Sequence, residues 1–267
     1  MDISQLEALF LLIAAKESKM RELDLLDTDL TSLQPRLLGE AINQLEKVNL
    51  SGSKLEGDQL NTMLEIFDYN TLLDINFDYL DLSKVWDEGL GRLLSSIEKL
   101  SLKKCSLSSL QVNTALAGLA ASEETKLRKI NFHGNNLSSL SGDSLAWLAL
   151  RLESLEVSQT GLSEASLTSL LTSLTSSPSR LRSLTLAGIS LASLSPESVS
   201  LLVLSPRLER LDLSNCSLSP SQLNSLLGSV GPPLREISLF NVKLEDLEKD
   251  ILSRANSQVF INHRYHI

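Results

Sequence analysis

The stretch Leu208-Glu-Arg-Leu211-Asp-Leu213-Ser-Asn-Cys-Ser-Leu218 decides the fold, because its pattern returns along the chain. An apolar residue is followed by two variable residues, an apolar residue, one variable residue, an apolar residue, four variable residues and a leucine. These positions, one to eleven, occur nine times, and position one is Met20, Leu45, Leu72, Ile97, Leu127, Leu152, Leu181, Leu208 and Leu234. Successive starts lie 25 to 30 residues apart. Nine matches in register indicate an array of structural repeats.

Leucine and serine dominate the composition of the chain, with 62 and 42 of its 267 residues. This bias favours a repeated unit over an ordinary mixed core. The longest apolar run, Ala8 to Ala15, is far shorter than the ~20 residues that span a bilayer. The first residues lack the positive charge of a signal peptide, and two cysteines cannot form a secreted disulfide framework. We therefore expect an intracellular protein in the cytoplasm, with the nucleus as an alternative.

The physical reason for the pattern lies in its central triplet, which alternates as a short strand does and sends positions four and six inward. The segment between triplets carries helical spacing, as in Leu167, Leu170, Leu171 and Leu174. Helix start signals, such as Ser195 before Pro196, occur in these segments. A single repeat cannot bury its apolar side, so neighbours stack. The sequence predicts an α/β solenoid, a horseshoe with parallel strands on the concave face and helices on the convex face.

The pattern is that of leucine-rich repeats, and repeats of this length with a helical segment resemble the ribonuclease-inhibitor-like class over roughly residues 20 to 255. That class also includes Ran GTPase-activating proteins, tropomodulins and the sensor arms of nucleotide-binding innate receptors. Ribonuclease inhibitors alternate two repeat types and are rich in cysteine. This chain has only Cys105 and Cys216, both at position nine. The resemblance is therefore to the fold class and not to that inhibitor.

A single domain over residues 1–267 is the expected organisation. Its parts are an N-terminal cap helix within 1–19, nine repeats over 20–255 and a C-terminal cap strand within 256–267. Caps are needed because a terminal repeat would otherwise expose its core to water. The segment Val259-Phe260-Ile261 is the expected last strand.

Catalytic and metal-binding signatures are weak. The pair His263 and His266 has the spacing of two metal ligands in a helix, but no cysteine or carboxylate nearby completes the set. The two cysteines are expected to be structural thiols that face the core. There is no nucleophile elbow or phosphate-binding loop, and carboxylates on open strands lack a cleft that excludes water. We expect no enzymatic activity, no cofactor and no small-molecule substrate.

Positions three, five, seven and eight are expected to face the open side of the strands. Their charged and aromatic residues are the candidates for partner binding: Asp24, Asp74, Asp78, Tyr79, Lys99, Lys103, Lys104, Lys129, His133 and Phe240. Residues 1–96 hold 8 Lys/Arg against 18 Asp/Glu, and residues 97–267 hold 16 against 15. Net charges of −10 and +1 predict a bipolar surface that orients a partner. A solvated face needed only for solubility is the other interpretation.

These observations favour a non-enzymatic module that binds a protein partner on its concave strand face, by analogy with related solenoids. The alternatives are a regulator of another enzyme, GTPase-activating or nuclease-inhibitor-like, and a recognition subunit of a ubiquitin ligase. Nucleic acid is disfavoured as a partner, because the chain has a pI of 4.9 and an acidic patch beside its basic residues. We expect no membrane partner.

Overall fold

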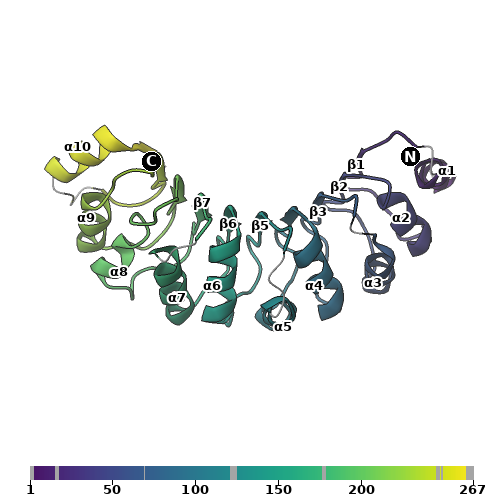
Figure 1. Ribbon diagram of the computed structural model, residues 1–267, viewed down its shortest axis with the longest axis horizontal. Helices are drawn as coiled ribbons and strands as arrows, with labels where there is room; N and C mark the ends of the chain where they lie inside the picture. The colour runs from purple at the N-terminus through teal and green to yellow at the C-terminus, as the bar shows by residue number, and fades with distance from the viewer. Residues whose placement is uncertain are drawn as a thin grey trace. The chain divides into compact units, whose positions relative to one another are not determined.

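The computed structural model describes residues 3–15, 18–68, 70–120, 125–175, 179–244, 247 and 249–262. They belong to two compact units, Met1–Asn136 and Leu137–Ile267. In each unit short parallel strands alternate with helices along the chain, and the strands lie on one side with the helices on the other (Figure 1). This arrangement confirms the predicted α/β repeat architecture.

The first unit holds five strands and five helices within the described residues. They are α1 (Ile3–Ala14), β1 (Glu22–Asp24), α2 (Pro35–Ile42), β2 (Lys47–Asn49), α3 (Gly57–Ile66), β3 (Asp74–Asn76), α4 (Asp87–Ser96), β4 (Lys99–Ser101), α5 (Ser109–Ala120) and β5 (Lys129–Asn131). Each strand pairs in parallel with the next one along the chain, and position three of one repeat faces position three of the next. The side chains of equivalent positions therefore form rows across the sheet.

The second unit repeats the arrangement. Its elements are α6 (Gly142–Arg151), β6 (Ser154–Glu156), α7 (Glu164–Thr175), β7 (Ser183–Thr185), α8 (Pro196–Ser200), β8 (Arg210–Asp212), α9 (Pro220–Gly228), β9 (Glu236–Ser238), α10 (Lys249–Gln258) and β10 (Phe260–Asn262). Pairing again follows chain order and the same register.

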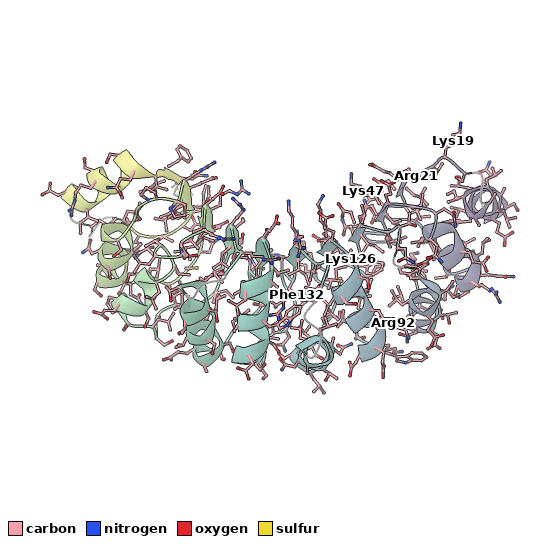
Figure 2. The ribbon with its side chains drawn as sticks, viewed as in Figure 1. Lys19, Arg21, Lys47, Arg92, Lys126 and Phe132 are labelled. Atoms are coloured by element: carbon pink, nitrogen blue, oxygen red, sulfur yellow. The ribbon has the colours of Figure 1, made fainter. Side chains whose placement is uncertain are left out.

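The core of each repeat lies between its strand and its helix. In the fourth repeat Ile97, Leu100, Leu102 and Leu107, at positions one, four, six and eleven, are all at most 3% exposed. Phe132, at position six of the fifth repeat, is fully buried (Figure 2). Burying a leucine-sized side chain is worth about 1.5–3 kcal/mol, so stacking of the four apolar rows is the main source of stability.

Glutamine side chains tie neighbouring repeats together at the helix starts. Gln222, which is 2% exposed, donates to the carbonyls of Leu191 at 2.8 Å and Leu194 at 2.7 Å in the preceding repeat. Its Oε1 accepts the backbone N–H of Ser219, whose hydroxyl caps α9 in return. Gln111 makes equivalent bonds in the first turn of α5. These amides add hydrogen-bond donors to carbonyls of the segment that precedes each helix.

The first and last described elements bury apolar side chains. In α1, Leu6, Phe10 and Ile13 are buried, and the helix packs against α2. At the other end β10 pairs with β9, and Val259 and Ile261 are buried. Among the residues that the structure describes, no helix combines the length and hydropathy needed to cross a membrane.

Candidate functional site

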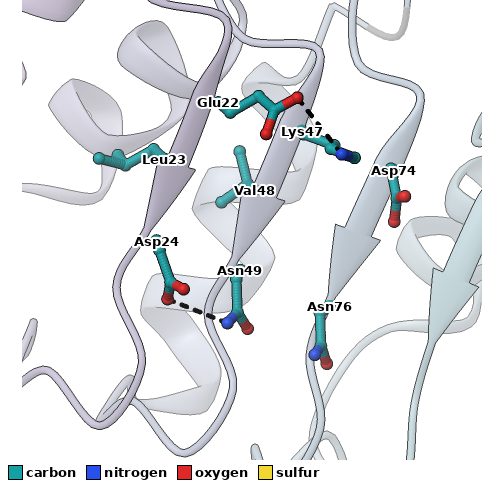
Figure 3. Close-up of a pocket in the computed structure, with 8 residues that line it drawn as sticks. All are labelled: Glu22, Leu23, Asp24, Lys47, Val48, Asn49, Asp74 and Asn76. Carbon is teal, nitrogen blue, oxygen red and sulfur yellow. Dashed lines mark hydrogen bonds and ion pairs between the residues drawn. The ribbon is translucent and has the colours of Figure 1, made fainter.

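We call the strand side of the first unit, formed by positions three, five, seven and eight of β1 to β5 and the turns that follow, the strand face. Over β1 to β3 it forms a groove of about 390 Å³, whose polar lining includes Glu22, Asp24, Lys47, Asn49, Asp74 and Asn76 (Figure 3). Lys47 points to the strand side, whereas Arg92 lies on the helix side (Figure 2). The groove is open, and its lining suits contact with a surface rather than enclosure of a small substrate.

The row at position three consists of charged residues that pair across the strands. Lys47 Nζ lies 3.3 Å from a carboxylate oxygen of Glu22, and Lys99 Nζ lies 3.8 Å from one of Asp74. Lys129 comes last in the row, is exposed, and forms no ion pair with a described residue. The row therefore neutralises itself over β1 to β4 and leaves one positive charge on β5.

Position five carries a structural role that its exposure hides. The side-chain oxygens of Asp24, Asn49, Asn76 and Asn131 each accept the backbone N–H two residues later, at 2.8 to 3.0 Å. The same bond ends β6 and β8 in the second unit. These side chains fix the turn after each strand, so Asp24 is at once an exposed charge and part of the scaffold.

Asp78 replaces this acceptor in the fourth repeat, where position five is Ser101 and its side chain is too short for the task. One carboxylate oxygen of Asp78 accepts the backbone N–H of Lys103 at 2.8 Å and the hydroxyl of Ser101 at 2.6 Å. Asp78 therefore positions the turn of the neighbouring repeat in addition to lying on the strand face.

Position eight adopts the left-handed conformation in all nine repeats, with φ between 51° and 71°. Gly52, Gly134 and Gly188 fill it without strain, and asparagine or aspartate fills it in three other repeats. Tyr79 at φ 64°, Lys104 at φ 51° and Gln159 at φ 54° are exceptions, because larger side chains rarely adopt this conformation.

The Tyr79 ring and the two lysines of the next repeat lie together. Lys103 Nζ is 5.4 Å and Lys104 Nζ is 6.0 Å from the ring centroid, within the range of cation–π attraction. The Tyr79 residue is 52% exposed, so the ring also faces solvent. In the sequence, Tyr79 is at position eight of one repeat, and Lys103 and Lys104 are at positions seven and eight of the next. The strand pattern alone does not predict that these side chains meet.

The ten sequence candidates divide between the two units, and all lie at exposed or half-buried positions. Nine are in the first unit: Asp24, Asp74, Asp78, Tyr79, Lys99, Lys103, Lys104, Lys129 and His133. Phe240 belongs to the second unit and is half-buried in the turn after β9, where its N–H donates to Ser214 Oγ at 3.2 Å. A smaller groove of about 130 Å³ lies over β7 to β9 in that unit.

The expected exposure of position seven differs from the structure in several repeats. Ser51, Ser158 and Ser214 are 3% to 8% exposed, because a serine at this position is too short to rise above its neighbours. Leu26, at the same position, is 56% exposed and was not among the candidates. The residues at position seven therefore differ widely in exposure, from buried serines to the exposed Leu26.

The two cysteines are buried and free. Cys105 Sγ lies 3.0 Å from the carbonyl oxygen of Phe77, and Cys216 Sγ lies 3.3 Å from that of Leu186. Burial, assisted at Cys105 by the charge of Asp78, raises the pKa of each thiol to about 12. Both are structural groups and not nucleophiles. No cluster of potential metal ligands occurs among the described residues, and the pair His263 and His266 lies outside them.

Comparisons with known proteins support the fold. No protein-family model and no curated protein matches the sequence. Among solved structures, the leucine-rich repeat-containing protein LegL7 from Legionella pneumophila is similar at a TM-score of 0.57 and 21% identity, over 95% of this chain and 86% of that one. Together with the nine repeats and the parallel strand order of each unit, this likeness shows that the chain has the α/β leucine-rich repeat fold.

Proposed function

We propose that this protein is a non-enzymatic interaction module that binds a protein partner on the strand face of its first unit. A leucine-rich repeat fold is in general a binding scaffold. The observation that carries the assignment to this face is the exposed Tyr79 ring, flanked by Lys103 and Lys104, beside an open polar groove.

The rigidity of the strand face supports this role. Asp24, Asn49, Asn76 and Asn131 lock the turns, and ion pairs hold the row at position three. Binding to a preorganised surface loses little conformational entropy, so even a contact area of polar residues gives useful affinity. Aromatic residues are frequent energetic centres of such contacts, which is the role we assign to Tyr79.

Site-specific photo-crosslinking tests this proposal with a matched control. The change replaces Tyr79 by a benzophenone-bearing phenylalanine analogue, which keeps an aromatic ring at this position. The control replaces Trp86, a 55% exposed aromatic residue at the start of α4 beside Glu88 and Arg92, in the same way.

In extracts of the source cells we expect one defined protein to be crosslinked from position 79 and not from position 86. The charge reversal Lys129→Glu should weaken that crosslink. Equal labelling from both positions, or crosslinks from position 86 alone, contradicts the assignment of the binding face. Identification of the crosslinked protein also decides between a scaffold, an enzyme regulator and a ubiquitin-ligase subunit.

A further inference from the structure

Most of the positive charges on the strand face gather at one end of it. We call this group the basic cluster: Lys99, Lys103, Lys104, Lys129 and His133, which lie on β4, β5 and the turns that follow. The opposite end carries three carboxylates on β1 and in the turn after it, beside Lys47 of β2: Glu22, Asp24 and Asp27. The charge pattern predicted from the sequence is therefore concentrated within one unit.

The acidic neighbours of the basic cluster cancel only part of its charge. Asp74 pairs with Lys99 at 3.8 Å, and one oxygen of Asp78 is engaged by Ser101 and by a backbone N–H. Lys103 and Lys104 lie against the Tyr79 ring, which attracts a cation without removing its charge. Lys104 and Lys129 form no ion pair with a described residue, which leaves a positive excess.

The backbone holds the Lys104 side chain in place. Its left-handed conformation aims the aliphatic stem along Gly134, where an added Cβ would lie 2.7 Å from Lys104 Cγ. The glycine therefore makes room for the lysine. Tyr79, on the other side, is fixed by its own left-handed backbone and by the N–H bond that it donates to the carbonyl of Lys103 at 2.8 Å. Both the ring and the ammonium groups are presented by defined backbone.

We propose that the basic cluster and Tyr79 bind an acidic, extended segment of the protein partner. This inference rests on the proposed function and names the chemistry of what is bound. Glutamate or aspartate side chains of the segment pair with Lys103, Lys104 and Lys129, and its backbone or an apolar side chain packs on the Tyr79 ring.

The charge distribution favours a protein segment over a nucleic acid. A phosphate chain that ran from the basic cluster along the strand face would meet the carboxylates of Glu22, Asp24 and Asp74. A short acidic peptide needs only the basic end. Its remaining length can meet the acidic end with basic or neutral residues, so the two ends together set the direction of binding.

Fluorescence anisotropy with defined peptides tests the proposal on the full chain. The probe is a labelled eight-residue peptide with four glutamates and one phenylalanine, and its partner has glutamine in place of each glutamate. The variants are Lys103→Gln and Lys104→Gln. Glutamine suits position 104 because Gln159 has the same left-handed conformation at the equivalent position of another repeat. The matched control is Lys54→Gln, which removes one exposed lysine in the second repeat of the same unit.

We expect the glutamate peptide to bind and the glutamine peptide to bind at least tenfold more weakly. Each cluster variant should weaken binding about threefold to fivefold, the range expected for an exposed charge pair, while Lys54→Gln has no effect. Raising the salt concentration from about 50 to about 300 mM, a sixfold increase in ionic strength, should weaken the binding of the glutamate peptide further.

Two results would overturn the inference. One is equal binding of both peptides, or no binding of either at protein concentrations up to about 1 mM, which detects dissociation constants of that order. The other is tighter binding of a labelled single-stranded oligonucleotide of equal charge through the same lysines. If the Tyr79 crosslink identifies a partner while the glutamate peptide fails, the binding face stands and only the acidic chemistry is wrong.

Discussion

The carboxylate of Asp78 accepts the backbone N–H of Lys103 across the boundary between two repeats, at 2.8 Å. In the other repeats of the first unit, the equivalent N–H at position seven donates to the position-five side chain of the same repeat. Asp78 therefore connects the scaffold of the third repeat with the presentation of Lys103 in the fourth, and its charge cannot be read as a binding feature alone.

Removal of the Asp78 carboxylate should loosen the fourth repeat. Asp78→Ala leaves the Lys103 N–H and the Ser101 hydroxyl without their acceptor, and we expect a loss of about 1–2 kcal/mol in the free energy of unfolding. Asp78→Asn retains an acceptor oxygen and should lose less. Urea unfolding followed by circular dichroism measures both.

The double variant Asp78→Ala with Ser101→Asn provides the control. An asparagine at 101 supplies the position-five acceptor that Asn76 and Asn131 supply in the neighbouring repeats. We expect it to restore most of the lost stability. If it does not, the turn bond is not the reason for the loss.

Gly134 is required by two independent constraints. Its φ is 71°, and a Cβ would lie 2.7 Å from Lys104 Cγ. Gly134→Ala should lower the unfolding free energy by about 1–2 kcal/mol, the cost of a left-handed residue plus the displaced lysine stem. Gly118→Ala is the contrast: this glycine lies in α5 with no atom within 4 Å of the added Cβ, so alanine should stabilise by about 0.5–1 kcal/mol. Thermal unfolding of both variants gives the comparison, and equal shifts would contradict it.

The thiols of Cys105 and Cys216 should be inert in the folded protein. Because the pKa of each is raised to about 12 from the ordinary 9.0, almost no thiolate is present at pH 8. In native protein, a disulfide reagent should label the two thiols only as fast as the protein unfolds. In about 8 M urea, which fully denatures a typical domain, labelling should be fast. Fast labelling of native protein would show that the thiols are accessible.

The same shift predicts a loss of stability at high pH. The folded state holds the thiol proton more tightly than the unfolded state, so the contribution is complete below pH 9 and is lost as the pH rises from 9 towards 12. The unfolding free energy of Cys216→Ala should fall less steeply in this window than that of the parent chain. Parallel slopes for the two proteins would contradict the assignment.

The Gln222 amide should be more important than its polarity suggests. Gln222→Leu removes the amide donor from the buried carbonyls of Leu191 and Leu194, of which Leu191 keeps the N–H of Leu194, and we expect a loss of about 1–3 kcal/mol. Gln159→Leu, at an exposed turn position, should change the unfolding free energy by less than about 0.5 kcal/mol. Chemical denaturation distinguishes the two, and a similar effect at both positions would refute the role of the amide.

Much of the fold follows from the sequence because the repeat fixes period, register and inward positions together. Ile97, Leu100 and Leu102 are identified as core by spacing alone, and Ser195 and Ser219 as helix caps by the proline that follows. The reason is that local propensity and stacking favour the same structure in every repeat.

The contacts on the strand face were harder to predict, because the position of a residue in the repeat does not show which bonds its side chain makes. The outward direction of Asp24, Asn49 and Asn131 follows from strand alternation, but their bonds to the turn depend on backbone geometry that alternation does not contain. The pairing of Tyr79 with Lys103 requires knowledge of the left-handed turn. Ser51 and Ser158 were expected to be exposed, but neighbouring groups cover them and both are buried.

At position eight, the left-handed backbone favours small residues, whereas the partner binding that we propose uses large ones. Stability of the fold and affinity for a partner therefore place opposite demands on this position. Glycine or asparagine is the comfortable occupant, as at Gly52, Gly188 and Asn215, whereas Tyr79 and Lys104 are retained against a conformational penalty. An engineer who placed glycine at both would gain a sturdier repeat and lose the ring and the ammonium group that we assign to the partner. Each repeat of this architecture thus offers a single adjustable position at which recognition can be installed or erased without disturbing the core.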